Sequence, residues 1–171
     1  MYLLQSMKVL TGIGLAFSVS AAAQTNEHEL GQFSDWQAIH YVEDGQRVCS
    51  MWSDPIQRGD HPSRGDAHAF IAHRGSEHVH EVSLQFGVDL KARSTVVAAI
   101  GKQRFKLYVD GDGAWNPSLG EDQRMVDAMR RGANLVVSAS TADGRKLKDT
   151  YSLSGFTAAH KAIGKACNIK S

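Results

Sequence analysis

Gln103-Arg104-Phe105-Lys106-Leu107-Tyr108-Val109 is the stretch that decides the fold class. Every second side chain along it is apolar, so that Phe105, Leu107 and Val109 share one face while charged residues and a tyrosine occupy the other. Side chains of a β-strand point alternately to its two faces. The alternation therefore predicts a strand with one buried side.

Similar short runs rich in Val, Ile, Phe, Tyr and Thr lie on both sides of this stretch, separated by turn residues. Asp44-Gly45 and Asp143-Gly144 are the strongest hairpin signals, because each supplies a glycine where a positive φ is needed. This pattern predicts an all-β domain. We expect strands at 36–42, 47–53, 67–73, 79–86, 94–100, 103–109, 135–140 and 146–153.

Two short helices are expected among these strands. Ser118 and Glu121 have the spacing of a capping box, and Gly132 is placed to end the helix that follows. Near the C-terminus Thr157 is expected to cap a second helix, in which Ala159 and Ile163 lie on the apolar face.

The N-terminus has the features of an export signal. Lys8 precedes an uncharged apolar stretch, and Ala21-Ala22-Ala23 forms a small-residue cleavage site. The stretch is too short to span a bilayer. We expect a signal peptide at 1–23, a flexible segment at 24–32 and one domain at 33–171, located in the periplasm or secreted, with no transmembrane segment after cleavage.

Cys49 and Cys167 are the only cysteines. In an exported chain the default state of such a pair is a disulfide, and the alternative is two buried thiols. A bridge closing so long a loop is expected to stabilise the fold by about 4 to 5 kcal/mol in the chain-entropy model.

Charge excludes several classes of partner. Once Lys8 is removed with the signal, acidic and basic residues are equal in number, and no run of like charges occurs. Bulk electrostatic binding to nucleic acid or anionic membrane needs a basic excess. We therefore expect an unknown protein or envelope partner and no nucleic acid.

Histidines crowd one predicted hairpin, which raises the possibility of a metal site. A two-residue loop would place His73, His78 and His80 on one face, whereas a three-residue loop that includes Glu77 would scatter them. The longer loop buries the larger side chain, Phe70, and is the register we favour. We expect no metal and no cofactor, and His73, His78 and His80 remain weak metal candidates.

A loop at 54–66 repeats one tripeptide, as Arg58-Gly59-Asp60 and Arg64-Gly65-Asp66. Arg-Gly-Asp in an exported protein suggests adhesion, although all three residues are ordinary in loops. We interpret these six residues as candidates for a binding loop, because exposed loops carry most contacts.

No catalytic motif is present, so no catalytic residue is assigned. Asp110-Gly111-Asp112-Gly113 lacks the later ligands of a calcium loop and is expected to form a turn. The sequence contains no G-x-S-x-G, phosphate loop or H-E-x-x-H. A hydrolase would need a site assembled in space from a histidine, a serine and a carboxylate.

Four segments in this order resemble the invasion-associated locus B family: Phe33-Ser34-Asp35-Trp36, the run 64–74, Gly111-Asp112-Gly113-Ala114-Trp115 and the run 151–159. The resemblance spans about 33–167. It implies an exported protein of Gram-negative bacteria with an immunoglobulin-like β-sandwich, and it supplies no catalytic residues. The aromatic residues in these segments are interpreted as core packing.

The resulting expectation is a non-enzymatic binding or envelope-associated protein, with the role in host-cell interaction that the family name suggests. One alternative is a metal-binding or stress-related periplasmic protein that uses the histidine-rich hairpin. A second alternative is a hydrolase.

Overall fold

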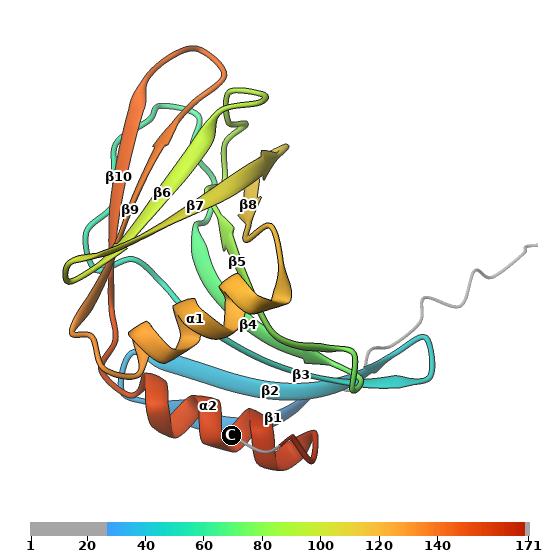
Figure 1. The fold of residues 1–171 in the computed structure, drawn as a ribbon. Helices are drawn as coiled ribbons and strands as arrows, with labels where there is room; N and C mark the ends of the chain where they lie inside the picture. Colours follow the sequence, from blue (N-terminus) through green and yellow to red (C-terminus); the bar gives the residue numbers. More distant parts are fainter. Residues whose placement is uncertain (1–26, 170–171) are drawn as a thin grey trace, which may run out of the picture.

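The computed structural model describes residues 27–169, in which ten antiparallel strands form one continuous sheet accompanied by two helices (Figure 1). The strands are ordered β1-β2-β3-β4-β5-β8-β7-β6-β9-β10. Their bounds are β1 His28–Phe33, β2 Trp36–Glu43, β3 Gln46–Ser53, β4 His68–Arg74, β5 His78–Gln85, β6 Thr95–Ile100, β7 Gln103–Asp110, β8 Gly113–Trp115, β9 Asn134–Ser140 and β10 Lys146–Ser152. The helices are α1 Leu119–Met129 and α2 Phe156–Ala166. The predicted all-β class with two short helices is confirmed.

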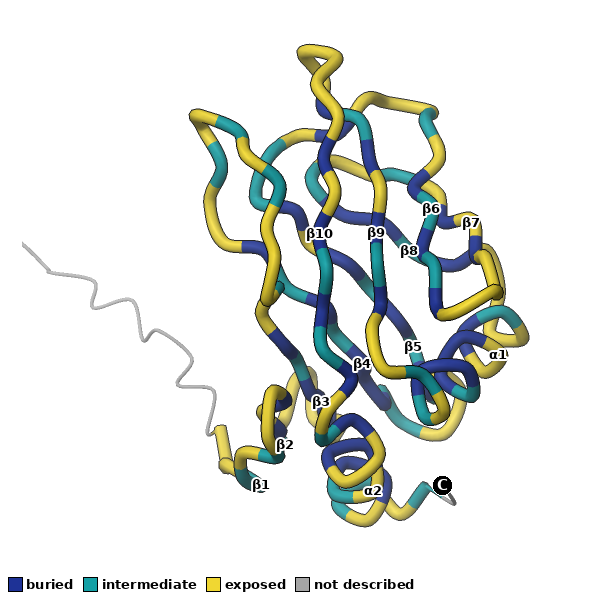
Figure 2. Tube along the Cα trace, turned by 90° about the vertical axis from the view of Figure 1, so that its left-hand side faces the viewer, coloured by how far each residue is buried: buried dark blue, intermediate teal, exposed yellow. Residues whose placement is uncertain are grey.

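The sheet bends strongly, so that β6, β9 and β10 stand at a steep angle to β2 and β3 (Figure 1). Buried apolar side chains from both halves form a single core, which includes Met51, Leu84, Leu107 and Tyr151. Figure 2 shows how buried and less buried positions alternate along β9 and β10. The strands on both sides of the core thus belong to one sheet, a continuity that the sandwich expectation did not include.

The outer edge of β10 is covered by the loop that follows β3. The Ile56 N–H donates to the Thr150 carbonyl at 2.8 Å, and the Thr150 N–H donates to the Gln57 carbonyl at 2.8 Å. Backbone groups at a sheet edge need partners, and this loop supplies them. It therefore ties β10, one end of the strand order, to the connection between β3 and β4.

The two helices pack on different parts of the sheet, α1 against β5 and β7 and α2 against β1 to β4. The Ser118 hydroxyl accepts a hydrogen bond from the Glu121 N–H, which confirms the predicted cap, although α1 ends at Met129 with Arg130 as its C-cap, before Gly132. The predicted cap of α2 at Thr157 is wrong: Gly155 holds that position at φ +86°. Only glycine fits there, because a Cβ would overlap the Phe33 carbonyl.

Each of the eight expected strands is present, and two more were missed. His28–Phe33 forms β1, paired antiparallel with β2, where the sequence predicted a flexible segment at 24–32. The turn predicted at Asp110-Gly111-Asp112-Gly113 is present, and it leads into an unexpected strand, β8, at Gly113–Trp115. The expected signal peptide at 1–23 lies outside the described residues.

Candidate functional site

A buried ion pair between Arg64 and Asp149 holds the loop at 54–66. The exposed fractions of the two side chains are 2% and 0%. The Arg64 guanidinium donates hydrogen bonds to both oxygens of the Asp149 carboxylate. It also donates to the carbonyls of Gly59, at 2.6 Å, and Phe86, at 2.7 Å. The Gly59 N–H donates to Asp149 Oδ1 at 2.8 Å. A bidentate pair with additional hydrogen bonds has a rigid geometry, so it fixes the path of the loop.

The two tripeptides of this loop therefore have different roles. Arg64 is withdrawn into the fold and cannot contact a partner. Arg58 and Asp60 are exposed, and the Arg58 guanidinium donates to the Gly65 carbonyl within the same loop. Of the six binding-loop candidates, Arg58, Asp60, Gly65 and Asp66 lie exposed on the surface.

An open cleft of about 450 Å³ lies between this loop and the hairpin that joins β9 to β10. The sequence identified the loop at 54–66 as a candidate contact surface, but it singled out neither His61 within this loop nor the hairpin opposite as a site. The lining residues are His61, Ser63, Gly87, Val88, Asp89, Asp112, Thr141, Ala142 and Asp143.

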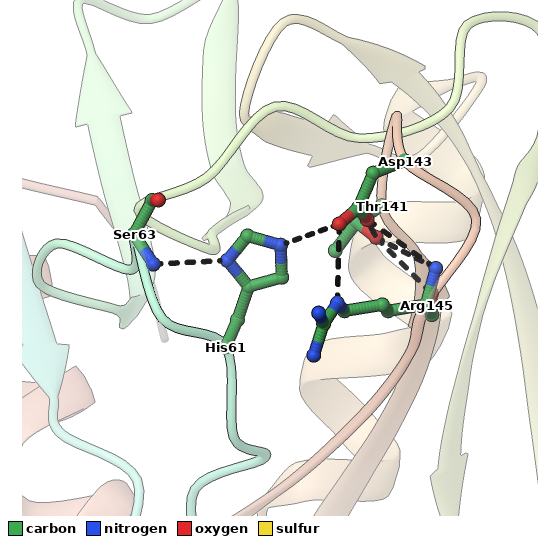
Figure 3. A network of polar contacts seen from close by, with 5 residues as sticks. All are labelled: His61, Ser63, Thr141, Asp143 and Arg145. Atoms are coloured by element: carbon green, nitrogen blue, oxygen red, sulfur yellow. Dashed lines mark hydrogen bonds and ion pairs between the residues drawn. The ribbon is translucent and has the colours of Figure 1, made fainter.

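His61 and Asp143 join the two sides of this cleft, with 3.2 Å between Nε2 and Oδ2 (Figure 3). The Thr141 hydroxyl donates to Asp143 and is the main cause that lowers the pKa of this carboxyl to about 2; the Arg145 N–H and His61 add to it. Asp143 is therefore ionised at neutral pH. The cleft thus presents a fixed negative charge next to an imidazole.

The cleft also brings His61 close to Ser63, the arrangement that a hydrolase would need. The contact, however, is through the main chain: the Ser63 N–H donates to His61 Nδ1 at 3.2 Å, and the hydroxyl points away from the ring (Figure 3). Nδ1 is occupied by this bond and Nε2 faces Asp143. Neither ring nitrogen can take the proton of the serine hydroxyl, as nucleophilic catalysis would require.

Three buried histidines meet beneath α2: His73 of β4, His80 of β5 and His160 of α2. The hairpin has the favoured three-residue loop, because Arg74 pairs with His78. The expected scattering of the histidines is nevertheless wrong. The register shifts beside His73, and His80 adopts φ +62°, so this β-bulge turns the two side chains toward one another, while His78 stays exposed.

Hydrogen-bond donors determine where the protons of these rings lie. Arg130 donates to His160 Nδ1 at 3.0 Å, and the His80 N–H donates to His73 Nδ1 at 3.0 Å. A guanidinium has no acceptor, so neutral His160 carries its proton on Nε2, which lies 3.0 Å from His80 Nδ1. Each ring therefore has a nitrogen that already accepts a hydrogen bond.

Burial and the nearby Arg130 charge keep this histidine cluster neutral. Burial is the main cause that lowers the pKa of His73 to about 4 and that of His160 to about 3, and it also lowers the pKa of His80. Candidate ligand atoms of the three rings lie within 4.8 Å of one another. Because Zn–N bonds measure about 2.0–2.1 Å and the accepting nitrogens are occupied, the rings would have to turn before they could bind a metal.

The predicted disulfide between Cys49 and Cys167 is present, with 6.0 Å between the Cα atoms. It joins β3 to the end of α2 across 118 residues of sequence. Cys49 pairs with His73 in the sheet, so neighbouring positions of β3 and β4 hold α2 at two points, Cys167 at its C-terminal end and His160 nearer its start.

The fold and its surface define a small β-sheet domain with one disulfide and an open cleft. Neither of its helices, α1 or α2, has the length and apolar character needed to cross a membrane. The family model of the invasion associated locus B (IalB) protein matches residues 36–164, and the chain belongs to this family. No curated protein and no solved structure shows a significant match to it.

Proposed function

We propose that this protein is an exported, non-enzymatic binding module of the cell envelope, and that the loop at 54–66 and the cleft beside His61 are its contact surface. The observation that carries the proposal is the buried Arg64–Asp149 pair, which holds an exposed loop in one conformation. A preorganised loop binds with a smaller loss of conformational entropy.

Export is supported by the bond between Cys49 and Cys167, because disulfides persist in oxidising compartments and are rare in the cytosol. Host-cell interaction is the role that the family name suggests. The exposed Arg58 and Asp60 are the part of the repeated tripeptide that remains accessible for it.

A binding role is favoured over the two alternatives by the geometry. At the cleft, the hydroxyl of Ser63 has no base within reach, which argues against a hydrolase. In the core, Arg130 donates to His160 and places a positive charge where a metal cation would bind. Saturable zinc binding by metal-free protein, lost in His160→Gln, would restore the metal alternative.

Site-specific cross-linking tests the contact surface. A photoreactive residue at position 58 or 143 should capture the same partner from envelope material. One at position 102, in the exposed turn between β6 and β7, should not. Equal capture from all three positions would contradict the proposed surface.

A further inference from the structure

Two aromatic rings lie side by side on the surface formed by β7 and β8, away from the cleft. Tyr108 and Trp115 are cross-strand partners whose ring centroids are 6.0 Å apart at an interplanar angle of 29°. Tyr108 is 53% exposed, one of few large side chains of this kind at the surface among the described residues. The core-packing interpretation of Trp115 therefore accounts for only part of its surface.

Gly113 permits this arrangement. The Trp115 ring lies across the Gly113 backbone, and a Cβ at that position would overlap the ring. A glycine in a strand interior often marks such a close approach. The ring consequently lies flat against β8.

A hollow of about 310 Å³ opens beside the two rings, at the lower end of the size range of small-molecule sites. It shares no lining residue with the His61 cleft. The lining residues are His78, Glu81, Val82, Tyr108, Trp115, Asn116, Pro117, Ser118, Leu119 and Asp122.

The Asp122 carboxylate is the buried acceptor that this hollow presents. Asp122 is 5% exposed, and its Oδ1 accepts from the Val82 N–H at 3.1 Å and from Asn116 Nδ2 at 2.9 Å. Its Oδ2 accepts no hydrogen bond from the described residues, and it is not enclosed by protein. Asn116 Oδ1 also has no partner in the described part of the chain, but it is enclosed by protein and is out of reach of a ligand in the hollow.

The fold explains the position of Asp122 Oδ1 but not that of Oδ2. β8 ends at Trp115, so the Val82 N–H has no strand partner on that side, and Asp122 Oδ1 satisfies it. Asp122 Oδ2 has no such partner among the described residues and opens into the hollow from a side chain that is otherwise buried. It is therefore placed to accept a hydrogen bond from a hydroxyl of a ligand.

We propose that this hollow binds a neutral saccharide ring, with its C–H face on Tyr108 and Trp115 and a hydroxyl donating to Asp122 Oδ2. No lysine or arginine lines the hollow, which argues against an anion. The N-terminus of α1 at Ser118 lies at its rim, and the positive end of the helix dipole opposes a cation. A neutral polyol supplies several O–H donors without net charge.

The test is an amide NMR titration of the mature, oxidised protein with three methyl glycosides, of glucose, galactose and N-acetylglucosamine, and with choline as a cationic probe. At least one glycoside should shift the amides of Trp115 and Asn116 saturably at millimolar concentration. Tyr108→Ala should weaken this binding about three- to tenfold, the range expected for loss of an aromatic contact. Ile56→Ala, a matched exposed apolar truncation in the other loop, should leave it unchanged.

Three outcomes would overturn the inference: no saturable shift with any glycoside, binding of choline alone, or equal affinity in Tyr108→Ala and wild type. Asp122→Asn adds a polar readout, because it should weaken glycoside binding while Asp127→Asn, on the exposed side of α1, should not. This site is separate from the loop at 54–66, so cross-linking from position 58 is expected to survive in Tyr108→Ala.

Discussion

Arg64, in the loop after β3, forms a buried ion pair with Asp149 of β10, which lies 85 residues later in the sequence. The pair ties β10 to the loop between β3 and β4, and at the same time it fixes the path of this loop beside the cleft.

Asp149→Asn is expected to destabilise the protein by about 3–5 kcal/mol, because it leaves the Arg64 charge buried without a counter-charge. Urea unfolding at pH 7 measures the loss. Replacing both residues, as Arg64→Met with Asp149→Leu, should recover much of it, since no unpaired charge remains. A loss below about 1 kcal/mol in Asp149→Asn, the range of a surface pair, would contradict the structural role assigned here.

Cys49→Ser is expected to lower stability under oxidising conditions by about 4–5 kcal/mol, since the bridge restricts a loop of 118 residues in the unfolded chain. Cys167→Ser should have the same effect. Under reducing conditions the variants and the wild type should unfold at closely similar urea concentrations. Equal unfolding of oxidised wild type and Cys49→Ser would show that the bridge does not form.

Acid is expected to destabilise the fold through the histidine cluster. The folded pKa values of His73 and His160, about 4 and about 3, lie below the ordinary value of 6.5, so the unfolded chain binds more protons below pH 6.5. Stability is therefore complete above pH 6.5 and falls as the pH drops toward 4, by roughly 1 kcal/mol per pH unit for each ring. Urea midpoints measured from pH 7.5 to 5 test this.

His160→Phe should reduce this pH dependence, because an apolar ring fills the same position beside Phe156 without titrating. His68→Gln, a change at a partly exposed histidine of β4, is the matched control and should keep the wild-type slope. Stability that stays constant from pH 7.5 to 5 in the wild type would contradict the neutral, buried state of the cluster.

Gly87→Ala is expected to disturb the loop at 54–66 more than Gly144→Ala, although both glycines have a positive φ. At Gly87 a Cβ would overlap the carbonyls of Gly65 and Asp66, whereas at Gly144 it meets nothing within 4 Å. Gly144→Ala should cost about 1–2 kcal/mol from backbone conformation alone. Gly87→Ala should cost more and speed tryptic cleavage after Arg58; equal losses would refute this packing.

Local patterns in the sequence predicted much of the fold. Alternation in Gln103–Asp110 and the hairpin signals at Asp44-Gly45 and Asp143-Gly144 are properties of adjacent residues, and they account for β7, β2 with β3, and β9 with β10. β1 is polar and β8 has only three residues, so neither carries an apolar alternation that could reveal it.

The candidate sites could not be predicted in the same way, because they depend on contacts between distant segments. His160 was missed since it meets His80 only when α2 packs on the sheet, although its spacing to Ile163 and Cys167 indicates the buried face. In the sequence Arg64 looks like an ordinary loop residue, because its contact with Asp149 exists only in the folded chain. The β-bulge at His80 likewise has no signal in the local sequence.

The central claim is that the chain is exported and oxidised, and the most direct measurement is made on the protein from its own cells. After fractionation, intact mass and thiol labelling report both the N-terminus and the state of Cys49 and Cys167. The account predicts a mature chain that begins at Gln24, lies outside the cytoplasm and has no free thiol. A full-length chain in the cytoplasm with both thiols free would contradict it.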